Sequence, residues 1–249
     1  RIIFSPDIGG EMLIWVNGRV VGSKDLEHAY ITLTRSAQAG EHFDILIESY
    51  AGHGPRLENG GPYPPGRVPV PEPPEFQVKV GPAVYAIWNE AAYQLGLDVY
   101  TLTKLLSVLD DKSLRAQRVA DGLKQFTYLV DFEQPAEKRV EGYIAARDAL
   151  APLMECVNGS TAPEFTIFGQ SHLDLAWKWT FEETKRKCSR TLSSQLALMD
   201  EYPEYRFMVC EPPILETVQT YYPELYDRVQ AKISNGQMMP EGAFYVECD

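Results

Sequence analysis

The chain has 249 residues, 45% of them apolar and 11% aromatic, enough to build the core of one large domain or of two smaller ones. Its formal net charge of -12 would repel nucleic-acid phosphates and anionic membrane surfaces, so neither is an expected partner and a neutral or cationic small molecule fits better. The four cysteines show no Cys-x-x-Cys spacing, which argues against a zinc ribbon or a disulfide framework and favours free thiols in the cytoplasm.

The first part of the chain has the short, alternating apolar pattern of β-strands and predicts an antiparallel β-sandwich domain at residues 1–53. Two apolar runs are separated by Asn17 and Gly18, which favour a tight hairpin because both residues tolerate positive φ. The strands are expected at residues 12–16, 19–21, 29–33 and 42–50.

A proline-rich and glycine-rich linker is expected at residues 54–75, because prolines cannot donate to helix or ladder hydrogen bonds. The pattern then changes to a helical period, which predicts a helical region at 76–160. One helical face would contain Val84, Ile87, Trp88, Ala91 and Leu95. Two further helices are expected at about 113–129 and 136–157.

From residue 164 the pattern alternates between strands and helices, which predicts a parallel α/β sheet in a domain at 161–249. The strands are expected at 165–168, 205–210 and 243–247, and the second helix at 223–234.

The first of these helices is expected to open at Thr180, with Glu183 completing a capping box. Its buried face would contain Cys188, Leu192, Leu196 and Met199. Its exposed charges would form the i,i+4 pairs Glu182–Arg186 and Glu183–Lys187, and residues 185–187 are expected to form a solvated face.

Three side chains fall at the expected carboxyl ends of parallel strands, where α/β proteins place their sites: His172, Asp174 and Asp249. An imidazole and a carboxylate two residues apart suit a divalent metal with nitrogen and oxygen ligands, and zinc is the natural candidate. A hydrogen-bonded loop pair, a capping role for Asp249 and a core position for Trp177 stay open on the residues alone.

The run Ser171-His172-Leu173-Asp174-Leu175-Ala176-Trp177 resembles the start of the catalytic domain of glycoside hydrolase family 38, the zinc-dependent α-mannosidases. The stretches 183–187, 201–204, 222–226 and 242–249 are similar to the segments that follow in that family, in the same order. The resemblance covers residues 164–249, and the preceding part looks like the extension found in the cytosolic and bacterial branch.

The resemblance implies that this domain begins a seven-stranded, barrel-like fold. It implies that His172, Asp174 and Asp249 bind zinc, that Asp249 also attacks the anomeric carbon, and that Trp177 stacks on the sugar. The implied reaction is the retaining hydrolysis of terminal α-D-mannosides from oligosaccharides. A fourth ligand and the general acid are expected beyond Asp249, so a chain that ended there is expected to be truncated and inactive.

Two other functions stay open. A sugar deacetylase or amidase could use the same His-x-Asp pair with a distant aspartate that acts on water. A non-catalytic carbohydrate-binding module could use Trp15 and Tyr30 of the sandwich, although aromatic residues in small sandwiches are usually core. A homo-oligomer is compatible with each of these functions.

Overall fold

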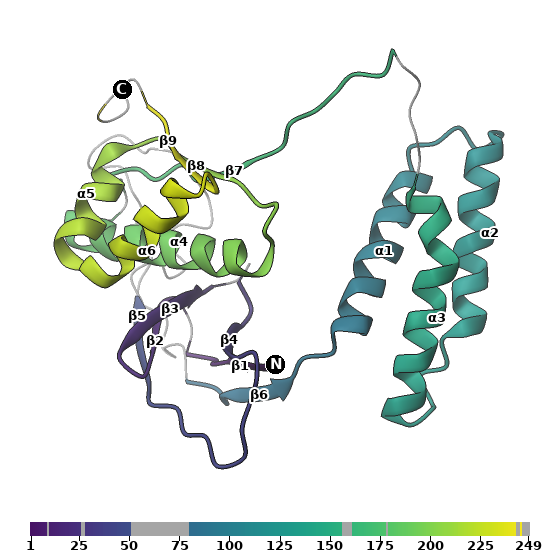
Figure 1. The fold of residues 1–249 in the computed structure, drawn as a ribbon, viewed down its shortest axis with the longest axis horizontal. Coiled ribbons are helices and arrows are strands. Elements are labelled where there is room, and N and C mark those ends of the chain that lie inside the picture. The colour runs from purple at the N-terminus through teal and green to yellow at the C-terminus, as the bar shows by residue number, and fades with distance from the viewer. Residues whose placement is uncertain are drawn as a thin grey trace, which may run out of the picture. The chain divides into compact units, whose positions relative to one another are not determined.

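The computed structural model describes residues 1–8, 10–25, 28–50, 80–155, 161–177, 179–242 and 245. Contacts divide the chain into two compact units, one of residues 1–87 with 166–249 and one of residues 88–165. The first unit contains sheets and the helices α4 to α6, and the second contains the helices α1 to α3 (Figure 1). The predicted sandwich and the predicted catalytic segment thus share one unit.

Six strands of the first unit form two antiparallel sheets, ordered β4-β1-β6 and β3-β2-β5. Their bounds are β1 Ile2–Ser5, β2 Glu11–Val16, β3 Arg19–Lys24, β4 Ile31–Thr34, β5 Ile45–Tyr50 and β6 Val84–Ile87. Asn17 and Gly18 join β2 to β3 with φ angles of 52° and 78°. The left-handed conformation of both residues confirms the predicted hairpin.

A hydrophobic cluster links the two antiparallel sheets. It contains Phe4 of β1, Ile31 of β4, and Met12, Ile14 and Val16 of β2. Successive side chains of a strand point to opposite faces, so these alternate residues of β2 share one face. The intervening residues of β2 face a second core.

The structure corrects the expectation of a helix that includes Val84 and Ile87. These residues form β6, which pairs antiparallel with β1. The helix α1 begins only at Glu90, after Asn89, whose side chain accepts a hydrogen bond of 3.1 Å from the Ala92 amide. Apolar residues three and four apart fit an exposed edge strand as well as a helix when the strand has only four residues.

The second unit is a bundle of three helices around its own core. The helices are α1 Glu90–Leu106, α2 Leu114–Leu129 and α3 Ala136–Met154. Ser113 caps α2 by accepting from the Ala116 amide, and this helix and the next confirm the predicted ones. The buried residues of the core are Leu95, Leu102, Val119, Val130, Tyr143, Ala146 and Leu150.

A short parallel sheet, ordered β7-β8-β9, completes the first unit and confirms the predicted α/β arrangement. Its strands are β7 Gly169–Gln170, β8 Phe207–Val209 and β9 Met238–Pro240, and its helices are α4 Phe181–Glu201, α5 Pro212–Tyr221 and α6 Pro223–Ser234. The predicted strand 165–168 is wrong, since pairing begins at Gly169. Most of the predicted strand 243–247 lies outside the described residues.

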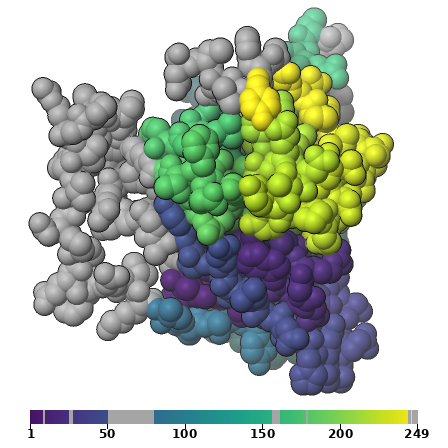
Figure 2. Space-filling view, turned by 90° about the vertical axis from the view of Figure 1, so that its left-hand side faces the viewer, coloured from purple at the N-terminus to yellow at the C-terminus, as the bar shows by residue number. Residues whose placement is uncertain are grey.

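Helix α4 joins the parallel sheet to the antiparallel strands. Its predicted apolar face is confirmed, since Cys188, Leu192, Leu196 and Met199 are all at most 2% exposed. The same core includes Leu13 of β2 and Val20 of β3, as well as residues of α5 and α6. In the space-filling view the purple N-terminal strands lie directly against the green and yellow helices (Figure 2).

No helix in the described ranges is both long and apolar enough to cross a membrane.

Candidate functional site

The predicted His-x-Asp pair lies just after the carboxyl end of β7. His172 Nε2 and Asp174 Oδ1 are 3.3 Å apart, and the two side chains are 50% and 37% exposed. This distance suits a hydrogen bond when the nitrogen carries a proton. It also suits two ligands of one tetrahedral metal ion, because donor atoms about 2.1 Å from the ion lie about 3.4 Å from each other.

A second carboxylate approaches His172 from the neighbouring strand. Glu211 follows β8, and its Oε1 atom lies 3.9 Å from His172 Nδ1. Its side chain is only 9% exposed. Sequence reasoning missed Glu211 as a site residue, although its place directly after a predicted strand was a signal that could have found it, because parallel strands end at one edge of the sheet.

Asp249, the predicted nucleophile and third metal ligand, lies outside the described residues. Its place in the site therefore stays a prediction. Within the described part of the chain, no group of three or more His, Cys, Asp or Glu side chains could hold a metal ion. Of the predicted zinc ligands, the structure brings His172 and Asp174 together.

Trp177, the predicted platform for a sugar ring, is 49% exposed. Its ring meets the ring of Trp179 edge to face, with 6.0 Å between the centroids and 89° between the planes. This exposure argues against the alternative of a core residue. A half-exposed indole offers an apolar face on which the C–H groups of a sugar can stack.

The segment that carries these side chains, called the site segment (residues 171–179), is joined to α4 by hydrogen bonds. Thr184 Oγ1 donates to the Leu175 carbonyl and accepts from Trp179 Nε1 at 3.0 Å. The Thr180 side chain accepts from the Glu183 amide at 3.4 Å, which forms the first half of the predicted capping box. These hydrogen bonds therefore fix the site segment against the first turns of α4.

Arg186 and Lys187 of α4 contact the antiparallel strands, and neither forms the predicted i,i+4 pair. Arg186 Nε donates to Glu48 of β5 at 2.6 Å, while Glu182 pairs with Lys185 at 2.6 Å. Lys187 Nζ donates to Glu11 of β2 at 2.5 Å.

Two further features of these ion pairs differ from the predictions. The Glu183 carboxylate forms an ion pair with Arg190. The Lys187 side chain is only 10% exposed, so the expectation of a solvated face is wrong for this residue.

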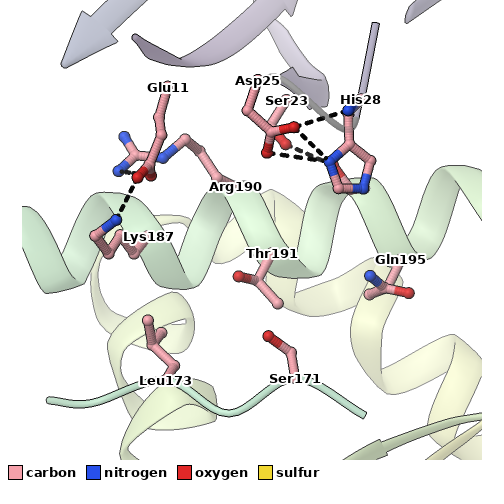
Figure 3. Close-up of a pocket in the computed structure, with 11 residues that line it drawn as sticks. Glu11, Ser23, Asp25, His28, Ser171, Leu173, Lys187, Arg190, Thr191 and Gln195 are labelled. Atoms are coloured by element: carbon pink, nitrogen blue, oxygen red, sulfur yellow. Dashed lines mark hydrogen bonds and ion pairs between the residues drawn. The ribbon is translucent and has the colours of Figure 1, made fainter. Parts of the chain in front are cut away.

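A cavity of about 210 Å³ adjoins the site segment, alongside α4 and the strands β2 and β3 (Figure 3). Ser171 and Leu173 line it, and Asp25 and His28 form a pair there at 2.9 Å. The remaining lining residues are Glu11, Ser23, Lys187, Arg190, Thr191, Ser194 and Gln195. Most of the lining is therefore polar or charged.

Burial raises the pKa of two side chains near the site. The pKa of the Cys188 thiol rises to about 12, mainly because its burial disfavours the thiolate. The pKa of Tyr205 is also raised by burial. Both groups therefore stay protonated at neutral pH.

Comparison with known proteins adds to this geometry. Residues 163–249 match the N-terminal domain of glycosyl hydrolases family 38. The chain is 28% identical over 251 residues to alpha-mannosidase G of Dictyostelium discoideum. It is 26% identical over 242 residues to alpha-mannosidase 2C1 of Mus musculus and 28% identical over 243 residues to that of Homo sapiens. Each alignment covers 96% of this chain and 22% of the relative's length.

Proposed function

Because residues 163–249 belong to the N-terminal domain of glycosyl hydrolase family 38, we propose that the whole protein hydrolyses terminal α-D-mannosides of oligosaccharides. The similarity to three alpha-mannosidases over 96% of the chain supports this proposal. Within the site, the observation that supports the proposal is the distance of 3.3 Å between His172 Nε2 and Asp174 Oδ1. We also propose that in the whole protein the sheet β7-β8-β9 belongs to a larger, seven-stranded barrel-like domain.

Zinc is the cofactor that we propose, with His172, Asp174 and Asp249 as ligands. The spacing of His172 Nε2 and Asp174 Oδ1 fits this donor set. When bound, zinc would supply a Lewis acid that attracts the oxygens of two neighbouring sugar hydroxyls. Glu211 Oε1, which lies 3.9 Å from His172 Nδ1, would move within hydrogen-bond distance, accept a hydrogen bond from that nitrogen and so orient the ring, as carboxylates beside metal-bound histidines do.

The reaction that we propose retains the configuration of the sugar. The Asp249 carboxylate would attack the anomeric carbon while the bond to the leaving oxygen breaks and a carboxylic acid protonates that oxygen. Water would then hydrolyse the glycosyl ester and restore the carboxylate. Trp177 would stack on the apolar face of the ring and hold it in line with Asp249.

The decisive experiment uses the whole protein and 4-nitrophenyl α-D-mannoside. We expect hydrolysis that stops when a chelator removes the metal and returns when zinc is added. A 2-deoxy-2-fluoro mannosyl reagent should leave a covalent adduct on Asp249, detected by peptide mass spectrometry. Release of acetate from an acetylated sugar, without a mannosyl adduct, would show that the protein is a deacetylase instead.

The structure gives little support to a separate carbohydrate-binding role for the sandwich. Of the two aromatic residues that could have bound a sugar, Trp15 packs against the core around α4, and the ring of Tyr30 lies under the Arg1 guanidinium, 5.9 Å from its centroid. The free thiols of Cys188 and Cys210 are compatible with the reducing cytoplasm that we propose as the location.

A further inference from the structure

A carboxylate of the N-terminal strands holds two cations of helix α4. Glu11 of β2 accepts from Lys187 Nζ through Oε1 at 2.5 Å, and its Oε2 atom lies 3.0 Å from Arg190 Nη2. The Lys187 and Arg190 side chains are 10% and 5% exposed. Figure 3 shows Glu11 reaching from the strand toward both. Cations this deeply buried lose most of their hydration, and the Glu11 carboxylate compensates for part of that loss.

The Lys187 ammonium also contacts an aromatic ring of the site segment. Its Nζ atom lies 4.4 Å from the centroid of the Trp179 ring. A cation at this distance is attracted by the electron-rich face of an indole, and the attraction increases when the cation is poorly hydrated. Lys187 therefore donates a hydrogen bond to Glu11 on the strand and contacts the Trp179 ring in the site segment at the same time.

Trp179 in turn is fixed in two other directions. Its Nε1 atom donates to Thr184 Oγ1 at 3.0 Å, and its ring meets the half-exposed ring of Trp177 edge to face. The orientation of Trp179 is thus set by a cation on one face and a hydrogen bond at its edge. Because an edge-to-face pair depends on the angle between the rings, the orientation of Trp179 affects that of Trp177.

We propose that Lys187, held by Glu11, is a positioning residue that keeps Trp179, and through it Trp177, in the orientation that a bound sugar needs. The inference rests on the proposed function in one respect, namely that Trp177 is the sugar platform. It gives the N-terminal strands a role in substrate binding, although none of their side chains has to touch the substrate.

The test uses the whole protein labelled with 5-fluorotryptophan and studied by fluorine NMR. The Trp177 and Trp179 resonances are assigned with the substitutions Trp177→Phe and Trp179→Phe. We expect both Glu11→Gln and Lys187→Met to shift the two resonances. We expect the KM for 4-nitrophenyl α-mannoside to rise about threefold, from the loss of a cation–π contact of this kind, with kcat nearly unchanged.

Two variants serve as controls. Lys187→Arg keeps a cation over the Trp179 ring and should retain both resonances and KM. Glu201→Gln removes a carboxylate that also bridges α4 and the N-terminal strands, since Glu201 forms ion pairs with Arg1 and Arg35. Glu201 is at the other end of α4, so its substitution should leave both resonances and KM unchanged.

The outcomes separate this inference from the proposed function. Unshifted resonances in Lys187→Met, or equal shifts in Glu201→Gln, would overturn the positioning role even if mannoside is hydrolysed. Shifted resonances in a protein that hydrolyses no mannoside would support the coupling of the two rings and refute the proposed function. If Glu11→Gln does not fold, Lys187→Met decides the result, because methionine fills the space of the lysine stem without a charge.

Discussion

Individual residues show where local chemistry, rather than the hydrophobic pattern, determines the structure of the site. His172 and Asp174 were predictable as neighbours, because an extended segment turns alternate side chains the same way. The contact of Lys187 with Glu11 was not predictable, because it joins residues that are 176 positions apart. No local pattern reports such pairs.

At Gly169, the absence of a side chain lets Tyr205 approach β7. A Cβ atom there would lie 2.0 Å from Tyr205 Oη, which donates to Gln195 at 2.6 Å. We expect Gly169→Ala to lower the free energy of unfolding by about 1–3 kcal/mol through overpacking. Urea unfolding measures the change.

A matched glycine provides the control for this prediction. A Cβ atom added at Gly96 in α1 would meet no other atom within 4 Å. Gly96→Ala should therefore stabilise the helix by about 0.5–1 kcal/mol. Equal effects of the two substitutions would contradict the argument.

The buried thiol of Cys188 gives a prediction about alkaline pH. Its pKa of about 12 exceeds the ordinary value of 9.0, so the native state keeps a proton that the unfolded chain loses. The protonated Cys188 thiol stabilises the folded state below about pH 9. This contribution to the free energy of unfolding is lost between about pH 9 and 12, at up to about 1.4 kcal/mol per pH unit. As the pH rises through this range, the free energy of unfolding should fall more steeply for the wild type than for Cys188→Ala.

Alkylation gives an independent check on the same thiol. In the native protein at pH 8, iodoacetamide should label the partly exposed Cys210 much faster than Cys188. Similar rates of labelling at both cysteines, read by peptide mass spectrometry, would show that Cys188 is not protected.

At the scale of elements, α4 was predicted best, because 21 residues with a consistent apolar face and a Thr180 cap leave little ambiguity. The helix α5 was missed because Pro212 and Pro213 suggest a break, although proline is favoured in the first turn of a helix. The strands β7 and β9 have only two and three residues, too few for an alternating pattern to be visible.

The tie between α4 and the site segment can be tested through Thr184. Thr184→Val keeps the shape of the side chain but removes the donor to the Leu175 carbonyl and the acceptor for Trp179 Nε1. We expect a loss of about 1–3 kcal/mol in the free energy of unfolding.

The exposed Thr103 of α1 offers a comparison. Its hydroxyl donates to the Val99 carbonyl of its own helix at 2.7 Å. Thr103→Val should cost less than about 0.5 kcal/mol, because water can replace the lost bond. If Thr184→Val lost no more stability than Thr103→Val, the hydrogen bonds of Thr184 to the site segment would contribute little to the free energy of unfolding.

At the scale of the whole chain, the two units differ in how far their cores depend on distant sequence. The buried residues in the core of α1 to α3 all lie between residues 95 and 150. The core around α4 combines Leu13 and Val20 with residues of the last third of the chain. The change in pattern at residue 164 was visible in the sequence, but the sharing of this core was not, because it joins segments more than 150 residues apart. The predicted linker at 54–75 lies outside the described residues.

This difference predicts how fragments behave. A fragment of residues 88–155 should be helical and unfold cooperatively, although its small size makes it only marginally stable. A fragment of residues 161–249 should lack a cooperative transition, because one side of its α4 core would be exposed to water. Circular dichroism during urea unfolding tests both, and a cooperative transition in the second fragment would contradict the shared core.

The shared core also has a consequence for synthesis on the ribosome. Leu13 and Val20 leave the ribosome roughly 160 residues before α4 is made, which at about 5–20 residues per second is a delay of about 10–30 s. During that time their face of β2 and β3 has no partner from the same chain. We expect nascent chains to be held by chaperones over this interval, and to be released once residue 201 has emerged.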